Sequence, residues 1–159
     1  MTNRQSIKAS TGNLQSNSLL LKLYKAYNGE IELISDYLYF SIIVSEYDTE
    51  ASRIFEEIAT EKIQGFKLLG ELLKSKGVDP SINATIKNTG TGQSQAAEDI
   101  RIDSSLIKSI SEMLTMYENN LIKILSEAKG LSDSESKKII MHVCDMGQKH
   151  VSVLGQIKV

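Results

Sequence analysis

Residues 53–80 have the sequence RIFEEIATEKIQGFKLLGELLKSKGVDP, and this stretch decides the fold class. Its apolar residues recur every three or four positions, which is the spacing of an amphipathic helix rather than of a strand. Gly77 followed by Pro80 closes the pattern in the order expected of a helix C-terminus. Asp48 precedes the pattern as a candidate N-cap. The sequence therefore predicts a helix over about residues 49–76.

The same spacing recurs in three other segments, which we expect to be helices over about residues 18–46, 104–129 and 133–157. Asp103 is a candidate N-cap for the third helix, and residues 132–135 (SDSE) have the form of a capping box before the fourth. One proline in 159 residues agrees with a largely helical chain. Gly29 predicts a weak point in the first helix, because glycine costs about 1 kcal/mol relative to alanine there.

Residues 78–103 (VDPSINATIKNTGTGQSQAAEDIRID) lack a sustained period and are rich in Asn, Thr, Ser and Gly, which is typical of a long connection. The other joints are only a few residues long. Short joints make neighbouring helices antiparallel, whereas a long crossover lets the second and third helices run parallel. We therefore predict an all-α, ferritin-like four-helix bundle, built from two antiparallel helical hairpins joined by this crossover. It would form one domain over residues 18–159, preceded by a flexible segment over residues 1–17.

Composition excludes several functional classes. With 41% apolar and 24% charged residues, the chain has the balance of a soluble globular protein. A net charge of -2 offers no basic surface for nucleic acid, and no apolar run approaches the roughly 20 residues of a membrane span. A single cysteine excludes an internal disulfide framework and a cysteine-based zinc site. No secretory signal is visible, so we expect a cytoplasmic protein.

Three strongly polar residues fall on the apolar faces of the predicted helices. A helical wheel of about 100° per residue places Glu30, Lys62 and His150 among the inward positions. Charged side chains are seldom buried unless they are paired, so we predict an ion pair between Lys62 and Glu30. His150 is predicted to be a core histidine hydrogen-bonded to Tyr37 or Tyr117. These five residues form the predicted polar constellation of the core.

Residues 27–43 (YNGEIELISDYLYFSII), residues 53–80 and the final segment KKIIMHVCDMGQKHVSVLGQI together resemble the ferritin-like superfamily, specifically bacterial rubrerythrin-type and manganese-catalase-like proteins. The resemblance covers about residues 20–80 well and 104–157 weakly. It implies a dimetal centre of iron or manganese, with a glutamate on the first and third helices and Glu-x-x-His on the second and fourth.

Only two of the six ligands that this resemblance implies are retained, Glu30 on the first helix and His150 on the fourth. The other ligand positions correspond to Lys62, Gly65, Ile110 and Gly147. A register shifted by one residue would instead use Glu61 and Gln64. The helical wheel disfavours this shift because Gln64 would then face outward.

One carboxylate and one imidazole cannot neutralise two metal ions, so we expect neither a metal, nor another cofactor, nor a catalytic residue. The leading hypothesis is a bundle that has lost its dimetal centre and has a structural, regulatory or interaction role. The expected partner is a second copy, contacted through Phe40, Ile43 and Phe55.

Two alternatives remain open from the sequence. The first is an iron or manganese oxidoreductase or metal-storage protein of the parent family, with Glu30, Glu61 and His150 as ligands. The second is a small-ligand binder, in which an anion lies between Lys62 and His150 in a space left by Gly65 and Gly147.

Overall fold

The computed structural model describes the backbone of residues 4–82, 101–131 and 133–159, and the side chains of these residues from Ser16 onward. These residues form four α-helices and one short 3₁₀ helix: α1 (Arg4–Val44), α2 (Thr49–Ser75), α3 (Ser104–Glu127), η1 (Ala128–Gly130) and α4 (Ser134–Leu154). The predicted all-α class is confirmed. None of the described helices combines the length and the apolar character needed to cross a membrane.

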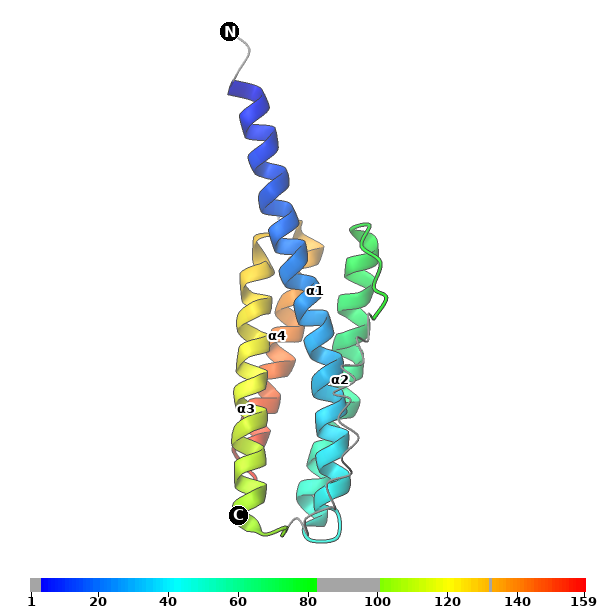
Figure 1. The fold of residues 1–159 in the computed structure, drawn as a ribbon, viewed down its shortest axis with the longest axis vertical. Coiled ribbons are helices and arrows are strands. Elements are labelled where there is room, and N and C mark those ends of the chain that lie inside the picture. Colours follow the sequence, from blue (N-terminus) through cyan, green and yellow to red (C-terminus); the bar gives the residue numbers. More distant parts are fainter. Residues whose placement is uncertain (1–3, 83–100, 132) are drawn as a thin grey trace, which may run out of the picture.

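Helices α2 and α3 begin at the predicted residues, whereas α1 begins at Arg4, well before the expected start at Ser18. Residues 4–17, expected as a flexible segment, extend α1 instead. No proline stops the helix upstream, and extension of an existing helix fixes only one further residue per hydrogen bond. Figure 1 shows this N-terminal part of α1 projecting past the ends of the other helices.

The predicted weak point at Gly29 is not a break, because α1 continues through it. A Cβ atom at this position would lie 2.8 Å from the Cδ1 atom of Leu121 on α3. This distance is shorter than real Cβ contacts, so the glycine permits a close approach of α1 to α3. The packing contact explains why a poor helix former occupies a helix interior.

Aspartate side chains cap the N-termini of three of the helices. Asp48 and Asp103 each accept a hydrogen bond from the backbone N–H three residues further on, at 2.9 Å in both cases, as predicted. On α4 the cap is Asp133 rather than the expected Ser132; it accepts from the backbone N–H of Ser136 at 2.8 Å. Asp133 also pairs with Lys76 at the end of α2, which adds a tertiary contact to this cap.

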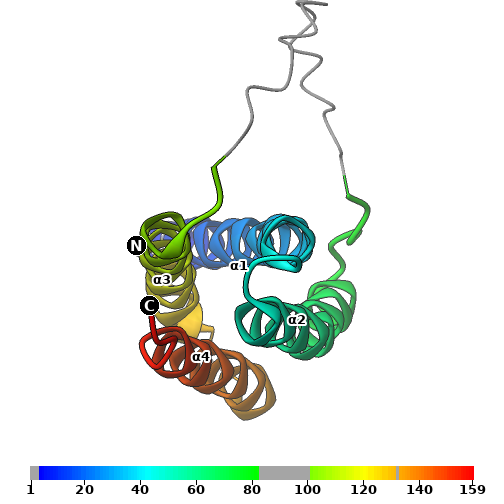
Figure 2. The same ribbon diagram turned by 90° about the horizontal axis from the view of Figure 1, so that it is seen from below.

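The helices pack side by side in a four-membered arrangement (Figure 2), with α1 beside α3 and α2 beside α4. Figure 1 shows that α1 and α2 are antiparallel, that α3 and α4 are antiparallel, and that α2 and α3 run in the same direction. Most of the predicted crossover, residues 83–100, lies outside the described residues. Its first residues fold back on α1, where Tyr27 donates a hydrogen bond to the Pro80 carbonyl at 2.8 Å.

All four α-helices contribute to the apolar core. Tyr27 of α1 stacks on Phe66 of α2, with ring centroids 4.4 Å apart, and Tyr37 lies against Phe55 further along the same hairpin. Each fully buried large side chain contributes about 1.5–3 kcal/mol by leaving water. Polar side chains interrupt this core near the middle of the bundle, and they form the candidate site.

Candidate functional site

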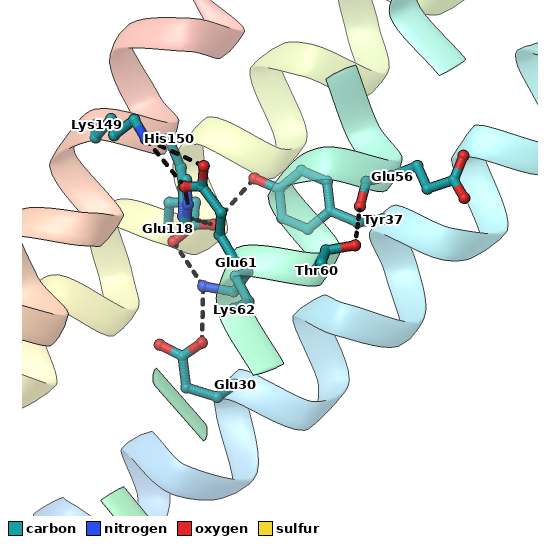
Figure 3. A network of polar contacts seen from close by, with 9 residues as sticks. All are labelled: Glu30, Tyr37, Glu56, Thr60, Glu61, Lys62, Glu118, Lys149 and His150. Atoms are coloured by element: carbon teal, nitrogen blue, oxygen red, sulfur yellow. Dashed lines mark hydrogen bonds and ion pairs between the residues drawn. The ribbon is translucent and has the colours of Figure 1, made fainter. Parts of the chain in front are cut away.

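Lys62 lies near the middle of α2 with only 2% of its surface exposed. Its Nζ atom is 2.9 Å from Oε2 of Glu30 on α1 and 3.1 Å from Oε2 of Glu118 on α3 (Figure 3). Both carboxylates are buried. The predicted ion pair between Lys62 and Glu30 is therefore present, and a second carboxylate completes a three-residue charge cluster. Two anions offset the cost of removing one ammonium from water.

Glu118 has further polar neighbours. Its Oε1 atom accepts a hydrogen bond from the Tyr37 hydroxyl at 3.0 Å, and Nδ1 of His150 lies 3.6 Å from the same oxygen. Burial favours the neutral carboxyl, but interactions with His150 and Lys62 outweigh it and lower the pKa of Glu118 below its usual 4.5. Burial, followed by the neighbouring Glu118, raises the pKa of Tyr37 well above 10.0.

Glu30 shows the opposite shift. Burial is the largest influence and raises the pKa of Glu30 above 4.5, although Lys62 acts in the other direction. Among the described residues, the ε-ammonium of Lys62 is its one charged partner within 4 Å. Within the described part of the chain, Glu30 has Lys62 alone to compensate the free-energy cost of removing its carboxylate from water. Glu118 has Lys62, Tyr37 and His150, so more of this cost is compensated there.

His150 connects the buried cluster to the bundle surface. Its Nε2 atom is 3.0 Å from Oε2 of Glu61, whose Oε1 atom lies 3.1 Å from Nζ of Lys149. The hydrogen bond from Lys149 is the main cause of a lowered pKa at Glu61, and His150 adds to it. Because a carboxylate only accepts, the proton of this contact resides on Nε2 of His150. Nδ1 has no hydrogen-bond partner among the described residues.

The predicted partners of His150 are therefore wrong, since it contacts Glu61 rather than Tyr37 or Tyr117. Tyr37 belongs to the cluster through Glu118. Tyr117 does not: its side chain is 37% exposed and lines a groove of about 600 Å³ between α1 and α3. The inward face of α3 is centred on Leu114, Glu118 and Leu121, so Tyr117 lies at its margin rather than in the core.

Glu118 is the residue that the sequence interpretation missed. Apart from Ile110, the buried residues on α3 follow alternating steps of four and three positions: Ile107, Ser111, Leu114, Glu118, Leu121 and Leu125. Such spacing is typical of a heptad repeat, in which these positions face the other helices. Glu118 is on this face of α3, and Tyr117 is not. Ile110, expected at the ligand position of the third helix, is an apolar core residue, and the α3 carboxylate that meets Lys62 is eight residues further on.

On α2 the structure places Lys62 and Gly65 inward and Gln64 outward, which agrees with the expected register. A Cβ atom at Gly65 would lie 3.4 Å from Val143, and one at Gly147 would lie 3.0 Å from Ile122. Neighbouring side chains therefore occupy the space beside both glycines, where the small-ligand hypothesis expected room for an anion.

The resemblance implies a dimetal centre, and the residues present do not fit one. The ammonium of Lys62 lies between the two inward carboxylates, at 2.9 and 3.1 Å, and Gly65 and Gly147 have no donor atoms. In the part of the chain that the structure describes, no three His, Cys, Asp or Glu side chains form a group that could hold a metal ion. Of the alternative ligands, Glu61 contacts His150, but Glu30 lies on the far side of Lys62 (Figure 3).

No family model, curated protein or solved structure matches the chain.

Proposed function

We propose that this chain is a ferritin-like bundle protein in which a lysine-centred charge cluster replaces the dimetal centre, and that its role is structural, regulatory or interaction-based rather than catalytic. The observation that carries the proposal is the position of the Lys62 ammonium, in contact with both Glu30 and Glu118. The parallel course of α2 and α3 supports the ferritin-like topology.

Electrostatics supports the same proposal. Two unit charges 4 Å apart interact by about 4 kcal/mol at the effective dielectric constant typical of proteins. The repulsion between the Lys62 ammonium and a divalent metal ion at that distance would be twice as large. A metal ion between Glu30 and Glu118 would have to displace an ammonium that already balances part of their charge. The lysine therefore supplies the positive charge that a metal ion supplies in a dimetal protein.

Metal content tests the proposal directly. The full chain is expressed in medium supplemented with iron or manganese, purified without chelator and analysed by mass spectrometry of the elements. We expect well under one ion per chain. One or more tightly held ions per chain would overturn the proposal.

A gain-of-binding pair provides the matched experiment. Lys62→Glu combined with Gly65→His restores a carboxylate and an imidazole beside Glu30, Glu118 and His150, so Mn²⁺ titration should show new binding. Lys62→Met is the control, because it removes the ammonium without adding a ligand. Circular dichroism establishes that each variant is helical. A folded double variant that binds no more Mn²⁺ than wild type would show that Lys62 does not occupy a ligand position.

For the partner, we propose a second copy of the chain, since apolar side chains remain exposed on the helices.

A further inference from the structure

The outer side of the α1–α2 hairpin carries a ridge of exposed apolar side chains. Ile42 of α1 is 71% exposed and Leu38, one turn earlier, is 41% exposed. Helical spacing places both on the side of α1 that carries Tyr27, towards α2, and away from Gly29, which approaches α3. Two adjacent apolar residues therefore project from the hairpin, away from α3 and α4.

The register of the hairpin shows where this ridge lies along α2. The Ser52 hydroxyl donates a hydrogen bond to the Ser41 carbonyl at 2.7 Å, and Lys62 contacts Glu30 further along. Leu38 and Ile42 therefore lie beside about residues 51–56, in the first half of α2. The ridge thus occupies one end of the outer face.

The other end of the same face is hollow. An almost wholly apolar groove of about 420 Å³ lies here between α1 and α2. Its apolar lining comes from Tyr27, Ile63, Phe66 and Gly70, with Pro80 at its edge. Ile63, at the end of this groove nearer the ridge, is 52% exposed. The outer face thus has an apolar ridge on one side of Ile63 and an apolar groove on the other.

The charges on this face that lack an ion pair within the described structure follow the same division. Glu56 lies beside the ridge, and Figure 3 shows its carboxylate pointing away from the core cluster. Lys67, Glu71 and Lys74 lie along the groove. Neither Glu56 nor Lys74 forms an ion pair among the described residues, and the pair of Lys67 with Glu71 is long, at 4.0 Å, and exposed. The two charges without an ion pair in the described part of the chain, Glu56 and Lys74, therefore stand on opposite sides of Ile63.

From this geometry we infer that the outer α1–α2 face is the interface with a second, antiparallel copy of this chain, related by a two-fold axis near Ile63. In such an isologous contact a patch meets itself, so each copy must supply both a projection and its complement. Leu38 and Ile42 of one copy enter the groove of the other, and Glu56 approaches Lys67 or Lys74 across the axis. Charge complementarity then sets the register of the pair.

This inference depends on the proposed second-copy partner and is independent of the loss of the dimetal centre. The proposed interface differs from the one expected from the sequence. Phe55 is fully buried against Tyr37 and is not available as a contact, whereas Phe40 and Ile43 are half-buried.

Sedimentation velocity of the full chain over a wide concentration range tests the interface. We expect the wild type to be a dimer, and Ile42→Asp and Ile63→Asp each to weaken association by at least about tenfold. Met116→Asp and Met141→Asp are the matched controls, since these methionines are 54% and 51% exposed on α3 and α4. The controls should remain dimeric, and circular dichroism should show all four variants to be folded.

Two further variants test the orientation. Glu56→Lys and Lys67→Glu should each weaken the dimer, and the combination of both should restore it. In a Cys144→Ala background, Ile63→Cys should form a disulfide between two copies on oxidation, because equivalent residues approach each other at a two-fold axis. Met116→Cys in the same background should not.

The outcomes separate the two proposals. A wild type that is monomeric at every concentration would overturn both the second-copy partner and this interface. A dimer that survives Ile42→Asp and Ile63→Asp but dissociates with Met116→Asp or Met141→Asp would overturn the interface alone. Neither result concerns the metal content, on which the proposal for the core depends.

Discussion

The two helical hairpins contribute the same kinds of side chain to the core and use them differently. The α1–α2 hairpin supplies Glu30 and Lys62, and the α3–α4 hairpin supplies Glu118 and His150. Lys62 contacts the buried carboxylates of both hairpins, whereas His150 hydrogen-bonds only to the partly exposed Glu61. The lysine is thus the shared centre of the bundle, and the histidine connects that centre to the surface.

The two buried carboxylates extend this comparison. Glu30 and Glu118 are almost equally inaccessible to solvent, yet their pKa values shift in opposite directions. Lys62 contacts both, but only Glu118 also has Tyr37 and His150 beside it. The number of favourable neighbours, rather than the depth of burial, decides which carboxylate is the more readily ionised.

The largest effect is expected from Lys62→Met, which removes the shared cation and leaves two buried carboxylates without it. Breaking a buried ion pair by removing one partner typically costs about 3–5 kcal/mol. Urea unfolding at neutral pH measures the loss. Lys123→Met, at an exposed position of α3 outside the proposed interface, is the matched control and should change stability by less than about 0.5 kcal/mol.

Removing the carboxylates as well should recover much of this loss. The triple variant Lys62→Met, Glu30→Gln and Glu118→Gln leaves no buried charge in the cluster, and neutral replacements of buried ion pairs are often well tolerated. A Lys62→Met protein as stable as the wild type would show that the lysine does not balance these carboxylates in solution.

A smaller and pH-dependent difference is expected between Glu118→Gln and Glu30→Gln. The folded-state pKa of Glu118 is below 4.5, so its contribution is fully present above that pH and is lost as the pH falls through the folded-state value. The folded-state pKa of Glu30 is above 4.5, so its contribution is present at low pH and is lost as the pH rises through the folded-state value. Glu118→Gln should therefore cost about 1–3 kcal/mol at neutral pH, and Glu30→Gln should cost less.

Urea unfolding of both variants from acidic to neutral pH checks this contrast. The deficit of Glu118→Gln should shrink on acidification below pH 4.5, whereas the stability of Glu30→Gln relative to wild type should improve as the pH rises. Equal deficits at every pH would contradict the asymmetry between the two hairpins.

The helices could be predicted from the sequence because their signals are local. Apolar spacing and aspartate caps lie within a few residues of each helix, so α2 and α3 begin as expected. The start of α1, which has no such cap signal, lies at Arg4 rather than at the expected Ser18. Asp133 caps α4 in place of Ser132 while also contacting Lys76, a neighbour more than fifty residues away that the local pattern does not reveal.

The candidate site could be predicted only in part. That Glu30, Lys62 and His150 face inward follows from the phase of each helix, and all three are buried. Which groups meet across helices is a non-local property, so the contact of His150 with Glu61 was not foreseen. To predict that Glu118 is buried, the rotational phase of α3 must be known to within a fraction of a turn. In the sequence, that phase is contained in the heptad spacing of the α3 residues.

The smallest effect is expected at the surface end of the network, from Glu61→Gln. Glu61 is 43% exposed and its partner Lys149 more so, and exposed ion pairs typically contribute at most about 1 kcal/mol. The glutamine carbonyl still accepts the hydrogen bond from Nε2 of His150, so only the charge is removed. Urea unfolding at neutral pH should show a loss below that of Glu118→Gln, and Lys149→Met should show a similar small loss. If Glu61→Gln instead costs as much as Glu118→Gln, the contact between His150 and Glu61 is as important to the bundle as the buried cluster, and the contrast between the hairpins fails.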